Sequence, residues 1–160
     1  MTNVTVKAAE GGSFSAYLAT PKTGKGPGIL VIQEIFGVNA AMREIADDYA
    51  SQGYVALCPD LFWRQQPGIE LTDKTDAEWK RAFELFNGFD QEKGVEDLKA
   101  AMKHLRGLPS CSGKVGWSVI ASAAGWLISW RRVAMSIARS VITALPSKAC
   151  STKPRISSVR

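Results

Sequence analysis

The sequence predicts an α/β fold in which helices flank a mostly parallel sheet. Two continuous apolar segments, residues 28–32 (GILVI) and 54–58 (YVALC), are typical of strands buried on both faces of a sheet. Segments with the apolar spacing of a helix follow them, and strands that alternate with helices of this length predict βαβ units. The chain has 160 residues and 46% hydrophobic side chains, which is enough for one core, so we expect one domain.

We expect the chain to open with a β-hairpin. Residues 4–6 and 14–18 are short apolar patches, and Gly11 and Gly12 between them signal a turn. The strand at residues 28–32 comes next. Because it is apolar throughout, we expect it in the middle of the sheet.

Three helices are predicted from cap residues and from apolar residues spaced three or four apart. Asn39 is the candidate N-cap of the first helix, whose apolar positions are 42, 45, 46 and 49, and Gly53 is its stop signal. Asp76 and Asp90 are expected to begin the second and third helices.

Charge is distributed unevenly along the chain. Residues 1–116 contain 13 basic and 15 acidic side chains, a net charge of −2, whereas residues 117–160 contain seven basic side chains and no acid. The second segment also carries three of the five tryptophans and is rich in Ser, Ala and Arg. We therefore expect a boundary near Gly116, between a body of residues 1–116 and an aberrant basic tail of residues 117–160.

Several classes of protein are disfavoured by composition. No basic run precedes an apolar segment at the N-terminus, and no stretch reaches the roughly 18 apolar residues that span a bilayer. A soluble cytoplasmic protein is therefore expected. Cys58, Cys111 and Cys150 have no CxxC spacing and are odd in number, so they indicate neither a disulfide framework nor a zinc site. No metal or organic cofactor is implied.

In a parallel sheet the chemistry lies beyond the carboxyl ends of the strands. That rule selects residues 33–39 (QEIFGVN), residues 59–65 (PDLFWRQ) and whatever follows residues 114–116 (KVG), which look like the start of a third parallel strand. His104, the only histidine, is predicted on the polar side of a helix away from any strand end. We expect it at the surface.

Glu34 is the first candidate site residue, and two interpretations of it stay open. Its apolar neighbours could raise the pKa of its carboxyl group and make it useful for proton transfer. Alternatively, it is a structural carboxylate paired with Arg43 or Arg81, and spacing alone favours this second interpretation.

Residues 28–68 resemble the dienelactone hydrolases, also called carboxymethylenebutenolidases. The similarity is almost continuous over GILVIQEIFGVNAAMREIADDYASQGYVALCPDLFWRQQPG, and FDQEKGVEDLKAAMKHLRGLP with SGKVG extends it to Gly116. QEIFGVN followed by CPDL is much narrower than a general hydrolase signal. The resemblance implies an α/β-hydrolase-like sheet that is incomplete at its C-terminal end.

The resemblance also implies a reaction and its residues. In the family a Cys, His, Asp triad opens an enol lactone such as dienelactone to maleylacetate, with the oxyanion held by backbone N–H groups. Glu34 matches the family glutamate that holds and activates the thiol, and the N–H of Ile35 matches one oxyanion donor. Arg81 corresponds to the arginine that binds the substrate carboxylate, with Trp79 as the competing match. The expected partner is a small-molecule lactone or ester.

The family's nucleophile is missing after Gly116. The family has a GYCLGG nucleophile elbow there, whereas this chain reads WSVIASAAGW. If one base were lost near the Gly116 codon, the shifted codons of residues 117–124 would permit VGYCLGG. We therefore expect residues 117–160 to be out of frame and the chain as written to be inactive. Ser122 lies in ASAAG rather than GxSxG and does not replace the cysteine.

The tail allows two other functions. WSVIASAAGWLISW followed by Arg131 and Arg132 could form a membrane-surface helix, which would make the protein a peripheral binding module. Its apolar residues do not segregate to one face, however, and nucleic-acid binding would rest on charge alone. We expect neither a membrane nor a nucleic acid as the partner, and the membrane-binding or other interaction protein is the alternative function.

Overall fold

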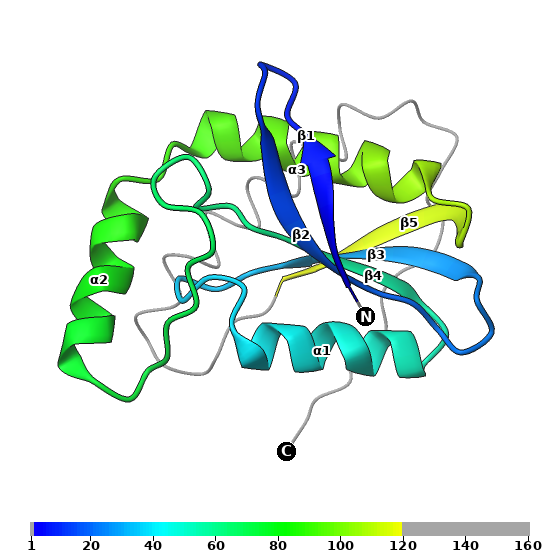
Figure 1. Ribbon diagram of the computed structural model, residues 1–160, viewed down its shortest axis with the longest axis horizontal. Coiled ribbons are helices and arrows are strands. Elements are labelled where there is room, and N and C mark those ends of the chain that lie inside the picture. Colours follow the sequence, from blue (N-terminus) through cyan, green and yellow to red (C-terminus); the bar gives the residue numbers. More distant parts are fainter. Residues whose placement is uncertain (1, 120–160) are drawn as a thin grey trace.

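A computed structural model describes residues 2–119, whose strands form one five-stranded sheet between helices (Figure 1). The strands are β1 (Thr2–Lys7), β2 (Ser13–Ala19), β3 (Gly26–Ile32), β4 (Val55–Pro59) and β5 (Cys111–Val119). The helices are α1 (Ala40–Ser51), α2 (Asp76–Asn87) and α3 (Gln91–Gly107). Every predicted element of this part of the chain is therefore present.

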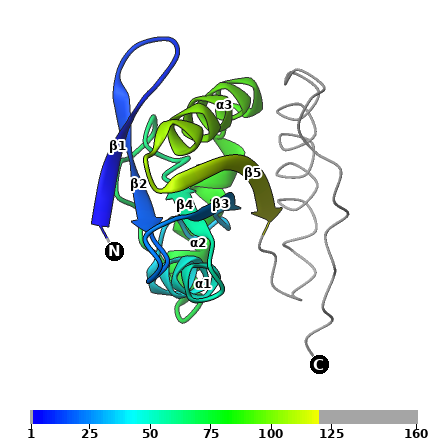
Figure 2. The same ribbon diagram turned by 90° about the vertical axis from the view of Figure 1, so that its right-hand side faces the viewer.

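The strand order is β1-β2-β4-β3-β5. β3 pairs in parallel with both β4 and β5, and β1 and β2 form the predicted antiparallel hairpin, in which Gly11 and Gly12 have positive φ. The parallel strands are those predicted, while the hairpin adds antiparallel pairs, so the described sheet is mixed. Figure 2 shows β1 and β5 at opposite edges.

Two apolar layers cover the two faces of the sheet, with α3 on one face and α1 on the other (Figure 2). Neighbouring residues of β3 show the division, because Leu30 packs with the α3 layer and Val31 with the α1 layer. Successive side chains of a strand point to opposite faces. A strand covered on both sides must therefore be apolar at every position, which is why residues 28–32 could be recognised.

The helix starts follow the sequence closely. The side chains of Asn39 and Asp90 accept the N–H groups of Met42 and Lys93, each at 3.1 Å, as N-caps do. The second helix begins at Asp76, as expected, and Thr75 is its N-cap. The reason is the Thr75-x-x-Glu78 spacing, which allows reciprocal hydrogen bonds at a helix start.

His104 corrects one expectation, because it is half-buried rather than at the surface. Its Nε2 atom is buried and has no hydrogen-bond partner among residues 2–119. His104 lies three residues after the buried Ala101 and next to the buried Leu105, so it sits at the border of the apolar face of α3.

The boundary predicted at Gly116 falls inside β5, which continues to Val119. Residues 120–160 lie outside the described part of the chain, and with them lie Ser122, most of the predicted basic tail and the proposed membrane-surface helix. None of the helices within residues 2–119 is long and apolar enough to cross a bilayer.

Candidate active site

The carboxyl ends of the three parallel strands meet at one edge of the sheet, as expected. Ile32 at the end of β3 is in register with Val119 at the end of β5, and Leu30 is in register with Leu57 of β4. The loop after β3 therefore lies between the loop after β4 and the end of β5. Gln33, the first residue after β3, therefore follows a position that is in register with the last residue of β5.

The loop after β3 forms a tight turn over residues 34–37. The N–H of Gly37 donates to the carbonyl of Glu34 at 3.4 Å, the bond that closes a β-turn. Gly37 has φ +80°, and a Cβ added there would lie 2.0 Å from the carbonyl oxygen of Ile69. Only glycine fits this position, because the φ angle and the close approach both exclude a side chain.

Gln33 connects this turn to the loop after β4. Its side chain is completely buried; Oε1 accepts the N–H of Leu61 at 3.0 Å, and Nε2 donates to the carbonyl of Glu34 at 3.4 Å. Sequence analysis did not single out Gln33. Its position could have indicated its role, because it directly follows an apolar strand and a buried amide there requires polar partners.

Glu34 and Ile35 lie in the turn itself. Glu34 is half-buried, and the side chain of Ile35 is 3% exposed. No residue among 2–119 accepts a hydrogen bond from the Ile35 N–H. The two arginines considered as partners of Glu34 form ion pairs with other carboxylates: Arg43 with Glu70 at 2.7 Å, and Arg81 with Glu84 at 3.0 Å.

Trp79, rather than Arg81, packs against the turn. The rings of Trp79 and Phe36 meet edge to face, with centroids 4.9 Å apart, and the Trp79 indole N–H donates to the carbonyl of Asp73 at 3.0 Å. Arg81 points elsewhere on α2, where its guanidinium donates to Gln66 Oε1 at 2.6 Å. The structure thus brings together Glu34, Ile35 and Trp79, and leaves Arg81 outside this group.

Asp60 organises the loop after β4. Its carboxylate is 4% exposed and accepts the N–H groups of Phe62 at 3.0 Å and Gly68 at 2.8 Å. Burial raises the pKa of this carboxyl group above its ordinary value, and the two backbone hydrogen bonds oppose that rise. Both carboxylate oxygens are therefore used to hold the loop.

Asp97 fastens the same loop to α3. It is 1% exposed, accepts two hydrogen bonds from Arg64 at 3.0 and 2.9 Å, and accepts the indole N–H of Trp63 at 2.8 Å. This carboxylate raises the pKa of Arg64, whose guanidinium stacks over the Trp63 ring at 4.5 Å. The sequence offered one signal for this role that was missed: Asp97 is an acidic residue next to Leu98 on the apolar face of a helix.

Cys58 is the buried cysteine closest to this edge, and its thiol is unreactive. Burial raises its pKa to about 12, with a further contribution from Asp60, so the nucleophilic thiolate is scarce at neutral pH. Cys111 is also buried. Residues 2–119 contain no cluster of three His, Cys, Asp or Glu side chains suited to a metal ion.

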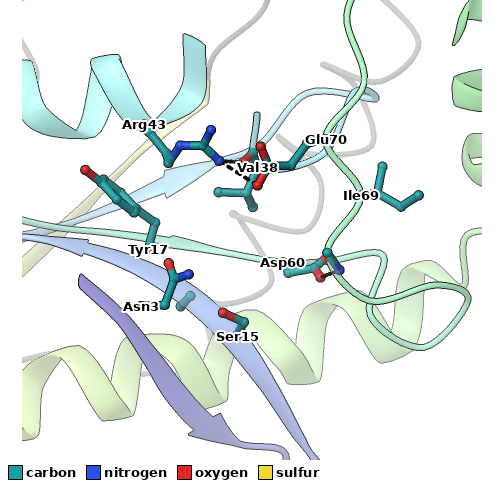
Figure 3. A pocket seen from close by; sticks show the side chains of 10 residues that line it. Asn3, Ser15, Tyr17, Val38, Arg43, Asp60, Ile69 and Glu70 are labelled. Atoms are coloured by element: carbon teal, nitrogen blue, oxygen red, sulfur yellow. Dashed lines mark hydrogen bonds and ion pairs between the residues drawn. The ribbon is translucent and has the colours of Figure 1, made fainter. Parts of the chain in front are cut away.

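A small cavity of about 80 Å³ lies between the hairpin, α1 and the segment after β4 (Figure 3), with Val38, which follows the turn, and Ile69 in its lining. Figure 3 shows the Arg43 and Glu70 ion pair at its wall, with Tyr17 on the hairpin side. Glu34 and Ile35 do not line it. The cavity therefore does not belong to the predicted site, and it is large enough only for a few water molecules.

Comparisons with known proteins identify the family to which the chain is similar. Residues 14–119 match the model of the dienelactone hydrolase family. A protein of Azospirillum brasilense, provisionally named a carboxymethylenebutenolidase, is 58% identical over 94 residues, which are 58% of this chain and 41% of that protein. The carboxymethylenebutenolidase of Pseudomonas sp. (strain P51) is 38% identical over 139 residues, 87% of this chain and 58% of that protein.

A solved structure supports the fold. The crystal structure of a provisionally named dienelactone hydrolase from Klebsiella pneumoniae is similar with a TM-score of 0.58 at 24% identity, over 76% of this chain and 51% of that one. The chain spans about half the length of the curated relatives it matches.

Proposed function

This chain belongs to the dienelactone hydrolase family, and from that premise we propose that the complete protein hydrolyses an enol lactone or a related ester at the carboxyl edge of its sheet. One observation carries the proposal: the hydrogen-bonded turn at residues 34–37, with Glu34 and the Ile35 N–H on it, comes directly after β3, whose last residue is in register with the end of β5. A lactone hydrolase needs such a donor next to its nucleophile.

In the proposed reaction, the turn at this edge supplies the oxyanion donor and the residues after β5 supply the nucleophile. A cysteine thiolate after β5 attacks the lactone carbonyl, and the electron pair of the C=O bond moves onto its oxygen. The Ile35 N–H donates to that oxyanion. Collapse of the intermediate breaks the ring C–O bond and leaves a thioester, which water then hydrolyses to the acid and the free thiol.

Glu34 is proposed to hold and activate the thiol. It lies in the turn two residues after Ile32, which is in register with Val119 at the end of β5, and this supports that role. A half-buried carboxylate so placed can accept the thiol proton, and the thiolate is the stronger nucleophile.

Arg81 is proposed to bind the carboxylate of the substrate. Its ion pair with Glu84 is exposed, with 40% of the Arg81 side chain accessible, so exchange of partners costs little. Trp79 is the alternative contact, supported by its packing on Phe36. Substituting each residue by alanine and comparing KM for substrates with and without a carboxylate separates the two roles.

We further propose that residues 117–160 are out of frame and that the chain as written is inactive. The absence of acids after residue 116, and a shifted reading that permits VGYCLGG, support this. The test is to resequence the gene across the Gly116 codon and to express both readings. We expect hydrolysis of an enol lactone only from the frame-restored protein, and its loss on Glu34→Gln; turnover by the 160-residue chain would refute inactivity.

A further inference from the structure

We propose that Gln33 is a positioning residue that aims the Ile35 N–H at the substrate oxyanion. The inference rests on the proposed function, because it concerns how that reaction's donor is held. The Glu34 carbonyl and the Ile35 N–H have a fixed relative direction, because they belong to one peptide group.

The carbonyl of Glu34 and the N–H of Ile35 belong to the same peptide plane. The described chain contains no cis peptide bond, and in a trans peptide the C=O and N–H bonds point in opposite directions. Whatever holds the Glu34 carbonyl therefore also sets the direction of the Ile35 N–H. Two donors hold it, Gln33 Nε2 and the Gly37 N–H, each at 3.4 Å.

Gln33 is itself fixed in orientation. Its Oε1 atom accepts the N–H of Leu61 at 3.0 Å, so the planar amide group is directed with its Nε2 toward Glu34. The side chain is fully buried, which prevents water from replacing either partner. The Gln33 side chain therefore links the loop after β4 to the peptide group that carries the Ile35 N–H.

The other end of the turn is equally constrained. Gly37 lies against the carbonyl of Ile69, and the Leu71 N–H donates to the Phe36 carbonyl at 2.8 Å. With both ends held, the Ile35 N–H points away from the bonds that close the turn, and no residue among 2–119 accepts it. A donor that is fixed before substrate arrives requires no reorganisation during the reaction.

The experiment must separate this role from a simple link between two loops. Gln33→Glu keeps an oxygen for the Leu61 N–H and, when measured at a pH where its carboxyl group is ionised, removes the donor to Glu34, whereas Gln33→Met removes both. Gln65→Met is the control, because Gln65 is an exposed amide whose Nε2 donates to the Leu85 carbonyl at 2.9 Å, away from the turn.

The first readout is amide hydrogen exchange at single-residue resolution, in the 160-residue chain and in the frame-restored protein. We expect Gln33→Glu to speed exchange of the Ile35 amide about tenfold while leaving that of Leu61 close to the parent's. Gln33→Met speeds both, and Gln65→Met changes neither. An unchanged Ile35 amide in Gln33→Glu, whether or not Leu61 responds, would overturn the inference.

The second readout is steady-state hydrolysis by the frame-restored protein. Misdirection of an oxyanion donor should lower kcat about tenfold or more with KM little changed. An unchanged kcat in Gln33→Glu also counts against the inference. If the frame-restored parent shows no hydrolysis at all, the proposed function fails, whereas the amide exchange still decides the role of Gln33.

Discussion

At the scale of single residues, Gly37 shows how a backbone contact fixes an amino acid. We expect Gly37→Ala to lower the free energy of unfolding, because the new Cβ would overlap the Ile69 carbonyl at 2.0 Å. Gly24→Ala is the control, since Gly24 has a similar φ of +75° and no atom within 4 Å of its added Cβ. In urea unfolding, the overlap should lower the free energy of unfolding of Gly37→Ala by about 1–3 kcal/mol more than that of Gly24→Ala. Equal losses in the two variants would contradict this expectation.

Cys58 shows how burial controls the reactivity of one side chain. With a pKa of about 12, its thiol should resist alkylation by iodoacetamide at neutral pH in the native chain and react readily in urea. Peptide mass spectrometry locates the label. Equal labelling of Cys58 in the two conditions would show that the thiol is accessible and ionised, contrary to its position in the core.

At the scale of elements, the start of α2 predicts a pH dependence. Glu78 accepts the N–H and hydroxyl of Thr72, and the hydroxyl of Thr75, and these bonds, led by the Thr72 N–H, lower the pKa of its carboxyl group. A carboxyl group whose pKa is lower in the folded chain stabilises it above the unfolded-state pKa. That contribution is lost as pH falls through the folded-state pKa.

Glu78→Gln should therefore flatten the acid side of the stability profile. Between about pH 7 and pH 3, the urea midpoint of the parent should fall further than that of the variant. Glu84→Gln changes another exposed glutamate of α2, outside the cap, and serves as the control. If the parent and Glu78→Gln fall in parallel, the cap does not depend on the charge.

Asp97 acts as a clamp between α3 and the loop after β4, because it bonds to Arg64 and Trp63, and its substitution should lower the stability of the fold. Asp97→Asn would remove the charged partner of the partly exposed Arg64 guanidinium and weaken the hydrogen bonds between them, at a cost of about 1.5–3 kcal/mol. Glu96→Gln, next to it on α3, breaks an exposed pair with Lys99 and should cost less than about 1 kcal/mol. Similar costs in thermal unfolding would mean that Asp97 does not act as a clamp.

At the scale of the whole molecule, the outer edge of β5 predicts self-association. Among residues 2–119 no strand pairs with that edge, and Trp117 and Val119 on it are only partly buried. Unpaired apolar edges recruit other chains. Sedimentation should show the 160-residue chain as oligomers at micromolar concentration and the frame-restored protein as a smaller species; a sharp monomer of the 160-residue chain would argue against an open edge.

The predictable part of the molecule is the part encoded by neighbours in the chain. Asn39 and Asp90 cap their helices with N–H groups three residues away, and residues 28–32 are apolar because both faces of their strand are covered. Such signals lie within a few residues of each other, so composition and spacing reveal them. The cap of the second helix is also local, because Thr75 and Glu78 lie three residues apart in the sequence.

Local patterns in the sequence were enough to predict the alternation of strands and helices, the helix starts and the sheet edge at which Glu34 and Ile35 lie. Three contacts became visible only in the folded chain: Gln33 with Leu61, Asp97 with Arg64, and Trp79, rather than Arg81, against the turn. These contacts join residues brought together by the sheet and its covering helices. Their partners depend on packing at long range, which local periodicity and charge do not specify.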